Sequence, residues 1–325
     1  MKPIRTGDDV DDLLRGAKAL AVMAAWTELG LFDVLDEGPR RPEDLPGDAR
    51  AIAITVPVLR HLGLLIDHGD RIGLSAAARR LKAAGQLPTA RNFEMLGDQT
   101  RMADVVKSGG PVTDAQGKSK GTDGGVTDDP EQAARFLDML YDKSADSAQT
   151  VYESLAPLLP PGASVLDLGG GHGRYARTFV DAGHSATLFD FPHVLEYARN
   201  KHGEALGYLG GNFRDPSTDL GGPYDLIFLS NIVHGEPDHE NRALMKRLAE
   251  VLSPGGHVVL KDMFLDEHGQ DPDNAVFFGL TMLFYTQAGQ SPSVRQATAW
   301  LEEAGLSDVR LSAMGPFQLL RARRL

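Results

Sequence analysis

The stretch that decides the fold is Val165-Leu166-Asp167-Leu168-Gly169-Gly170-Gly171-His172-Gly173-Arg174. A short apolar run containing an acid is followed by a cluster of glycines and then by a helix-compatible segment, residues 175–181. This order is typical of a buried parallel strand that turns sharply into a helix. Glycine suits such a turn because it adopts backbone angles that other residues avoid, and because a Cβ atom would intrude on a ligand there. The stretch therefore predicts a nucleotide-type loop.

A second acid follows this loop at an informative distance. The next apolar run, residues 186–191, contains Asp190 near its end, roughly 20 residues after Asp167, where an acid can accept hydrogen bonds from ribose hydroxyls. Both NAD folds and S-adenosylmethionine folds contain such a pair. Gly169, Gly171 and Gly173 form G-x-G-x-G, however, whereas a pyrophosphate site favours G-x-G-x-x-G. The pattern resembles motif I of class I S-adenosylmethionine-dependent methyltransferases.

Composition limits the class of protein. The chain has 325 residues, 42% of them hydrophobic and 24% charged, which is ordinary for a globular protein with two domains. Its net charge of −12 argues against general affinity for nucleic acids or anionic membranes, because both need a basic surface. The absence of cysteine excludes disulfides and thiolate chemistry. We find no signal-peptide pattern in residues 1–12 and no membrane-spanning run, so we expect a cytoplasmic protein.

The first hundred residues predict a small, mainly helical domain. Residues 8–35 place apolar side chains at helical spacing, and this face suits a core or a partner helix equally well. Two further helical segments, residues 42–49 and 50–62, precede a turn at residues 68–70 between short strands, which is typical of a winged helix. A DNA-binding winged helix should be basic, whereas residues 1–100 carry a net charge of −2. We therefore favour a packing and dimerisation module.

The rest of the chain predicts a second domain. Glycine-rich residues 108–129 indicate a surface loop, with a lid over a site as the alternative, and residues 130–159 indicate one long bridging helix. Strands then alternate with helices, which predicts a doubly wound parallel sheet. The last two strands are joined only by Gly315-Pro316, too short a link for a parallel crossover, so they should form an antiparallel hairpin. The expected divisions are 1–105, 106–159 and 160–325.

Taken together, the chain resembles the bacterial and plant small-molecule O-methyltransferases that have an N-terminal winged-helix dimerisation domain. The resemblance extends over essentially all residues. It implies an α/β fold with a Rossmann-like class I methyltransferase sheet, S-adenosyl-L-methionine as cofactor, and a homodimer formed through the first helix of the N-terminal domain.

The resemblance also assigns a cofactor site. The loop glycines would approach the methionine end of the cofactor. Asp190 would hold its ribose, and Phe191 would lie beside its adenine. The segment Gly211-Asn212-Phe213 matches the family's Gly-Asp-x-Phe segment at the adenine, with Asn212 in place of the acid. Ser230 and Asn231 fall at the sulfonium end. The implied set is Asp167, Gly169, Gly170, Gly171, Gly173, Asp190, Phe191, Asn212, Phe213, Ser230 and Asn231.

The catalytic residues are implied by a motif that this chain carries in altered form. The family's His-Asp-Trp-x-Asp reads His-Gly-Glu-Pro-Asp from residue 234, which keeps the general base His234 and loses the Asp and Trp between. A second family acid follows the fifth strand, and Asp262 occupies its place. Both residues should lie at the carboxyl ends of neighbouring strands, where a carboxylate can orient an imidazole. A histidine that only packs at a strand end is the alternative for His234.

An apolar and aromatic run, residues 277–285, precedes Gly289. Most such runs belong to a core, but in this family the segment lines the acceptor pocket, which would suit a flat aromatic molecule. A third family acid is replaced here, most closely by Ser291. The implied pocket residues are Met139, Tyr141, Phe278, Met282, Tyr285 and Ser291. The leading hypothesis is O-methylation of a hydroxylated aromatic small molecule in secondary metabolism.

Other functions stay open at this point. The altered motif is compatible with carbon methylation or with a non-methylating reaction on the same scaffold. His234, Asp238 and His239 carry potential metal-ligand atoms. The pattern His-x3-Asp-His is weak evidence for a metal site without a third defined partner, so we expect no metal. A regulator that binds DNA through residues 36–75 is a further alternative. The sequence does not identify the acceptor or the methylated atom.

Overall fold

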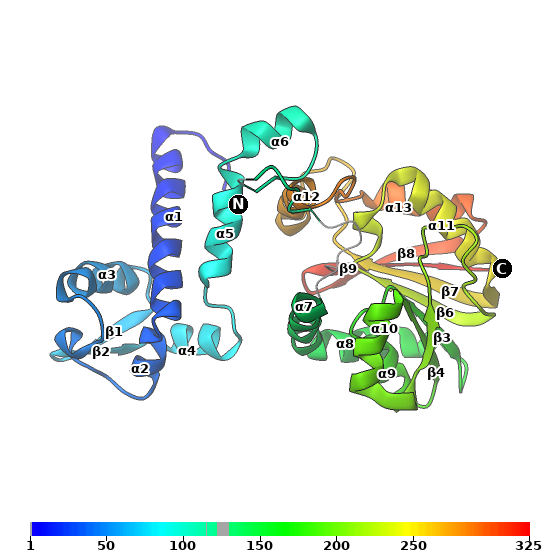
Figure 1. Ribbon diagram of the computed structural model, residues 1–325, viewed down its shortest axis with the longest axis horizontal. Coiled ribbons are helices and arrows are strands. Elements are labelled where there is room, and N and C mark those ends of the chain that lie inside the picture. Colours follow the sequence, from blue (N-terminus) through cyan, green and yellow to red (C-terminus); the bar gives the residue numbers. More distant parts are fainter. Residues whose placement is uncertain (1, 115, 122–129) are drawn as a thin grey trace. The chain divides into compact units, whose positions relative to one another are not determined.

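The computed structural model describes residues 2–114, 116–121 and 130–325 (Figure 1). The chain divides into two compact units, Met1–Ala103 and Asp104–Leu325. The segment that we expected to bridge two domains, residues 106–159, belongs to the second unit.

The first unit consists of helices around a small hairpin. Helix α1 (Gly7–Glu28) begins with a capping box between Thr6 and Asp9, which satisfies backbone N–H groups at the helix start. The expected hairpin follows a helix, but the helical segment expected over residues 42–49 is wrong. Only a 3-10 turn, η1 (Pro42–Asp44), forms there, because Pro46 and Gly47, with a φ of 128°, interrupt the segment. The further elements are α2 (Leu31–Asp36), α3 (Ala49–His61), β1 (Leu65–His68), β2 (Arg71–Leu74), α4 (Ala76–Ala83) and α5 (Ala90–Gln99), and α6 (Met102–Ser108) crosses into the second unit.

A core of large apolar side chains holds this unit together. Trp26, Phe32 and Ile72 come from α1, α2 and β2, and they are almost fully buried. The indole Nε1 of Trp26 donates to Thr55 Oγ1 on α3 at 3.0 Å, so the buried polar atom of the largest side chain is satisfied. These contacts bury the C-terminal half of α1, and the N-terminal half is left largely exposed.

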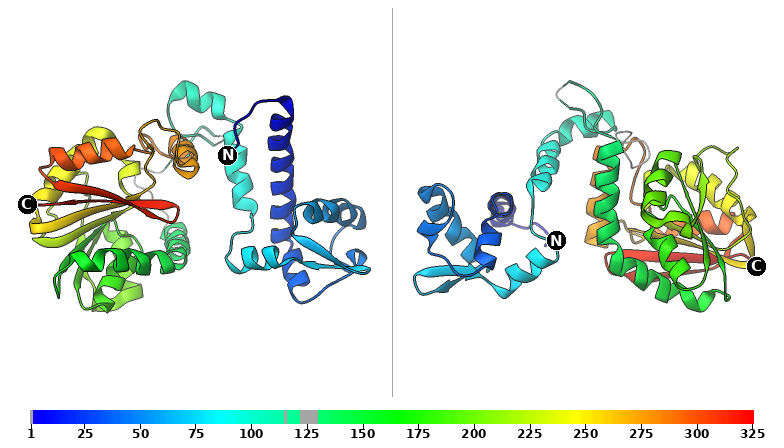
Figure 2. Two further views of the ribbon diagram at one scale, coloured as in Figure 1. Left: turned by 180° about the vertical axis from the view of Figure 1, so that it is seen from behind. Right: turned by 60° about the horizontal axis from the view of Figure 1, so that its bottom comes forward.

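The second unit is a seven-stranded sheet in the order β5-β4-β3-β6-β7-β9-β8. Its first five strands are parallel, and the β8–β9 hairpin is antiparallel and closes one edge, as the rear view in Figure 2 shows in red. The doubly wound sheet and the terminal hairpin are thus confirmed. The strands are β3 (Ser164–Leu168), β4 (Ser185–Asp190), β5 (Gly207–Gly210), β6 (Tyr224–Ser230), β7 (Leu252–Asp262), β8 (Ser307–Met314) and β9 (Phe317–Arg323).

Helices cover both faces of the sheet (Figure 1). Along β7, Val259 packs in the cluster with α8 and α9, and Leu260 packs in the cluster with α11 and α13. Because both faces are covered, the central strands are apolar on both sides. The helices are α8 (Ala145–Leu155), α9 (Arg174–Asp181) and α10 (Pro192–His202) on one face, and α11 (Asp238–Glu250) and α13 (Val294–Glu303) on the other.

The prediction of one continuous helix over residues 130–159 is wrong. The structure has α7 (Pro130–Lys143) and α8, separated at Ser144, and a short 3-10 turn at Ala156–Leu158. The Ser144 hydroxyl donates to the carbonyl of Tyr141 at 2.9 Å. Such a local side-chain bond competes with the regular helical pattern, and it accompanies the break here.

The described part of the predicted loop lies against α12 (Asp273–Tyr285). The backbone N–H of Val112 donates to the carbonyl of Phe284 at 2.9 Å, and Lys120 N–H donates to Val112 at 2.8 Å. Residues 122–129 of that loop lie outside the described residues, and the lid stays a prediction. In the portion of the chain that the structure covers, we find no helix with the length and hydrophobicity needed to cross a bilayer.

Candidate functional site

The glycine loop follows β3 and has little room for side chains. A Cβ atom on Gly170 would lie 2.4 Å from both Asp167 Cγ and Leu188 Cδ1. Gly171 has a φ of 52°, in the left-handed region that favours glycine. The loop therefore brings bare backbone to the carboxyl edge of the sheet, where open α/β folds bind their ligands.

Asp167 is the buried acid beneath this loop. It is 1% exposed, and its Oδ2 accepts from Ala176 N–H at 3.1 Å, whereas its Oδ1 has no hydrogen-bond partner. Burial, with a smaller contribution from Asp190, raises the pKa of Asp167 to about 7. An unpaired buried oxygen of this kind fits a cationic ligand group, which would stabilise the charged carboxylate.

Asp190 contacts the loop from the end of β4. Its Oδ2 accepts from Gly171 N–H at 2.9 Å and its Oδ1 from Phe191 N–H at 2.8 Å. Burial raises the pKa of Asp190. Each carboxylate oxygen retains a further lone pair, so ribose hydroxyls can still bind. Phe191 stacks on His193 with ring centroids 5.8 Å apart, which places a flat apolar surface beside this acid.

The other expected cofactor residues lie after β5 and β6. Asn212 Oδ1 accepts from Arg214 N–H at 3.0 Å, and Phe213 packs against the core. Ser230 ends β6, and Asn231 follows it with a φ of 59°, rare for a residue other than glycine. These positions lie at the same edge of the sheet as the glycine loop, and their individual roles in cofactor binding remain predictions.

His234 and Asp262 are brought together as the strand order predicts. The imidazole Nδ1 lies 2.8 Å from Asp262 Oδ1, and the side chains are 13% and 1% exposed. Asp262 Oδ1 also accepts from Met263 N–H at 2.8 Å, which fixes the carboxylate. A carboxylate at Nδ1 holds a proton on that nitrogen, so Nε2 presents a lone pair. The arrangement can remove a proton from a substrate.

Helix α12 and the turn after it pack against this histidine. The ring of Phe278 meets the imidazole edge to face, with centroids 4.7 Å apart. Gln290 N–H donates to the carbonyl of His234 at 2.8 Å, so the turn also fixes the backbone that carries the base. Ser291 Oγ donates to Ala275 O at 2.7 Å, and Met282 is buried on α12. The predicted acceptor segment therefore borders the base, with Phe278 in direct contact.

The ring of Tyr141 contacts residues of the glycine loop, α9 and α10. The guanidinium of Arg174 sits 3.5 Å above its ring, and Lys201 Nζ lies 4.1 Å from the ring centroid. Its ring also meets His172 edge to face at 5.9 Å. These contacts place Tyr141 beside the glycine loop. The pocket roles of Tyr141, and of the partly buried Met139 and Tyr285, remain predictions.

The sequence interpretation overlooked a buried lysine at this edge. Lys261 is 1% exposed, and its Nζ lies 3.5 Å from the Phe317 ring centroid and 3.4 Å from Ser230 Oγ. Burial lowers the pKa of Lys261 to about 8. Val258, Val259 and Leu260 are apolar and fully buried, and such a run could have indicated that the lysine in the next position is also buried.

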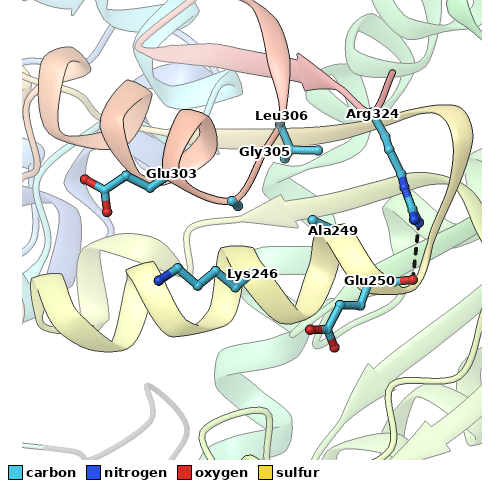
Figure 3. Close-up of a pocket in the computed structure, with 8 residues that line it drawn as sticks. Lys246, Ala249, Glu250, Glu303, Gly305, Leu306 and Arg324 are labelled. Carbon is cyan, nitrogen blue, oxygen red and sulfur yellow. Dashed lines mark hydrogen bonds between the residues drawn. The ribbon is translucent and has the colours of Figure 1, made fainter.

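A pocket of about 370 Å³ lies away from these residues (Figure 3). It is formed where α11 and α13 end, and Arg324 donates there to the carbonyl of Glu250 at 3.3 Å. Helices that connect parallel strands end near the amino edge of the sheet, so this pocket faces the edge opposite the base. Within the described ranges, no group of three His, Asp or Glu side chains could hold a metal ion.

Comparison with known proteins identifies the family of the chain and agrees with its fold. Residues 100–307 match the model of the O-methyltransferase domain family. The chain is 26% identical to 3-hydroxy-5-methyl-1-naphthoate 3-O-methyltransferase of Streptomyces sahachiroi, covering 92% of this chain and 89% of that protein. An O-methyltransferase family protein from Burkholderia thailandensis superposes with a TM-score of 0.80 at 21% identity over 99% of both chains. Human N-acetylserotonin methyltransferase in complex with SAM gives 0.75 at 21% identity, covering 100% of this chain and 99% of that one.

Proposed function

Because the chain belongs to the O-methyltransferase domain family and is an S-adenosylmethionine-dependent methyltransferase, we propose that it methylates a hydroxyl group of an aromatic small molecule, with His234 as the base. The observation that carries the proposal is the 2.8 Å contact between His234 Nδ1 and Asp262 Oδ1 at the carboxyl edge of the sheet. Phe278 beside the imidazole supports an aromatic acceptor, because an apolar ring can pack against it.

Each residue of the site has a separate role in the proposed reaction. When bound, the cofactor would supply a methyl group on a sulfonium for transfer to an acceptor oxygen, and the thioether of S-adenosylhomocysteine would be the leaving group. Asp167 would hold the cationic amino group and Asp190 the ribose, so that the donor is oriented at the glycine loop. His234 would accept the hydroxyl proton at Nε2, and Asp262 would stabilise the imidazolium that results. The turn at Gln290 holds the backbone of His234 in place.

Orientation should contribute more to the rate than proton transfer. Holding two reactants in line is worth roughly 7–11 kcal/mol, whereas general base catalysis contributes about 10²–10⁴-fold. A phenol and a free imidazole differ in pKa by roughly 3.5 units, so complete proton transfer beforehand would cost about 4.8 kcal/mol. We therefore expect the proton to leave as the methyl group is transferred.

The test of the proposed function is methyl transfer from labelled S-adenosylmethionine to a panel of phenols, catechols and enols. We expect the label to enter at least one phenol or catechol as a methyl ether. Label found only on carbon or nitrogen of these acceptors would contradict O-methylation of an aromatic hydroxyl. Such an outcome would favour the carbon-methylation alternative.

The binding of S-adenosylhomocysteine should depend on pH through Asp167. The pKa of this acid is raised to about 7, so below that pH its carboxyl group must lose a proton before it can pair with a cationic amino group. We expect the affinity to fall about tenfold per pH unit as the pH drops below 7, and to level off above about pH 8. Calorimetric titrations between pH 5.5 and 8.5 measure this.

The control for this pH dependence is the Asp167→Asn variant, whose amide does not titrate. The variant should bind weakly at pH 8 and show a flat profile. Burial and nearby cations lower the pKa of His172 to about 4, so that buried side chain stays neutral throughout the range. A wild-type affinity that does not change with pH would remove Asp167 from the proposed role.

We also infer a homodimer through α1. The N-terminal half of this helix exposes Val10, Leu13 and Leu14 by 46%, 44% and 57%, an apolar face that its own unit does not cover. Replacing both Leu13 and Leu14 with aspartate should convert a dimer to a monomer in light-scattering measurements. The matched control is the exposed Val106→Asp change in α6, which should leave the dimer intact. A wild-type protein that is monomeric at micromolar concentration would contradict the inference.

A further inference from the structure

Glu236 stands where the catalytic motif departs from its usual form, and it makes a partly buried ion pair. Its carboxylate accepts from Arg214 Nε at 2.8 Å and from Arg214 Nη2 at 2.5 Å. The side chain of Glu236 is 5% exposed and that of Arg214 is 29% exposed. Two parallel N–H···O bonds fix the direction as well as the distance between the partners, which a single contact would not do.

The pair joins two segments that serve different parts of the reaction. We call residues 211–214 the adenine segment and residues 231–237 the base loop. Arg214 directly follows the residues expected at the adenine, and its own N–H binds Asn212 Oδ1. Glu236 lies two positions after His234. A displacement of either segment must therefore bend the ion pair or move the other segment.

Helix α11 restrains both segments as well. Asn241 is fully buried, and its Nδ2 donates to the carbonyls of Val233 and Glu236 at 2.9 and 3.1 Å. On the next turns of α11, Arg247 donates to the carbonyls of Phe213 and Thr218 at 2.5 and 2.7 Å. The ion pair thus closes a ring of contacts that runs from the base loop through α11 to the adenine segment and back.

We propose that Glu236 is a positioning residue that couples the adenine segment to the orientation of His234. The inference rests on the proposed function, because it assigns the adenine to residues 211–214 and the base to His234. A buried ion pair is weak evidence for stability, since apolar replacements often fold as well. A bidentate pair between two loops can fix their relative position. Breaking it should therefore disturb both cofactor binding at the adenine segment and the orientation of His234 in the base loop.

The test measures each change at the opposite end of the pair. Glu236→Gln alters the base loop, and the calorimetric affinity for S-adenosylhomocysteine reports on the adenine segment. Arg214→Gln alters the adenine segment, and the imidazole resonances of His234 report on the base, in protein with ¹³C-labelled histidine without ligand. His234→Ala identifies those resonances by their loss.

We expect Glu236→Gln to weaken binding of S-adenosylhomocysteine roughly tenfold, the effect of losing one hydrogen bond to a charged group. We expect Arg214→Gln to shift the His234 resonances. Arg214→Lys keeps the charge but not the bidentate geometry, so it should reproduce most of both effects. It replaces the glutamine variant in the test if that variant does not fold.

Arg177→Gln is the control, because Arg177 forms an exposed pair with Asp181 on α9, and it should change neither reading. The proposal is overturned if folded Glu236 and Arg214 variants bind S-adenosylhomocysteine within twofold of the wild type and leave the His234 resonances in place. These readings need no acceptor. A failure of His234→Ala to lower the rate would therefore contradict the base assignment. The coupling would still be decided by the calorimetric affinities and the His234 resonances.

Discussion

Replacing His234 with alanine should lower kcat by roughly 10²–10⁴-fold, the usual contribution of a general base. The imidazole is held at Nδ1 by Asp262 and its ring packs against Phe278, and the alanine variant lacks the Nε2 that would take the acceptor proton. The affinity for S-adenosylhomocysteine should change little, because the predicted cofactor residues are retained. Steady-state rates with an acceptor found in the panel, together with calorimetry, measure both quantities.

Two further variants show whether this loss comes from the base. His239→Ala removes an exposed histidine five residues later, and it should leave kcat unchanged. Asp262→Asn keeps the size of the partner but not its charge, so it should lower kcat without removing the imidazole. A loss of less than about tenfold in His234→Ala, with cofactor affinity intact, would exclude the base role.

The second large effect is expected at Gly170. Alanine there would bring a Cβ atom to 2.4 Å from Asp167 Cγ and from Leu188 Cδ1, so the buried acid or the loop must shift. Overpacking of this kind costs about 1–3 kcal/mol, and it displaces the group proposed to hold the cofactor's amino group. We expect the affinity for S-adenosylhomocysteine to fall roughly 10- to 100-fold in a calorimetric titration.

Gly97→Ala is the matched control for this change. Gly97 lies in α5, and a Cβ atom added to it would meet nothing within 4 Å. Alanine is also the better helix former, so the control should be as stable as the wild type or slightly more stable. If Gly170→Ala bound S-adenosylhomocysteine as tightly as Gly97→Ala, the close-packed loop would not form the cofactor site.

Much of the second unit could be predicted because its signals are local. The glycine loop follows from the order of a buried strand, glycines and a helix, and the antiparallel hairpin follows from the short link at Gly315-Pro316. The meeting of His234 with Asp262 follows from parallel strands whose carboxyl ends share one edge. Each step needs only a pattern in the chain and a general rule of sheet geometry.

The remaining features depend on side-chain contacts that no simple pattern in the chain specifies. The break at Ser144 is accompanied by a local hydroxyl bond that helix propensity alone does not predict. The direction in which the Tyr141 side chain points depends on how α7 is rotated about its axis. In the structure its ring packs against Arg174 and Lys201, which are distant in the sequence. The pair of Arg214 with Glu236 spans two loops, and the sequence signals it only through the altered motif around His234.

The most direct test of the central claim is a crystal structure of the protein with S-adenosylhomocysteine. We expect the ribose hydroxyls at Asp190, the amino group at the buried Asp167, and the sulfur facing the Nε2 side of the His234 imidazole. A ligand bound away from residues 169–173 would contradict the account. So would a complex in which His234 Nε2 is turned away from the sulfur and toward the protein interior.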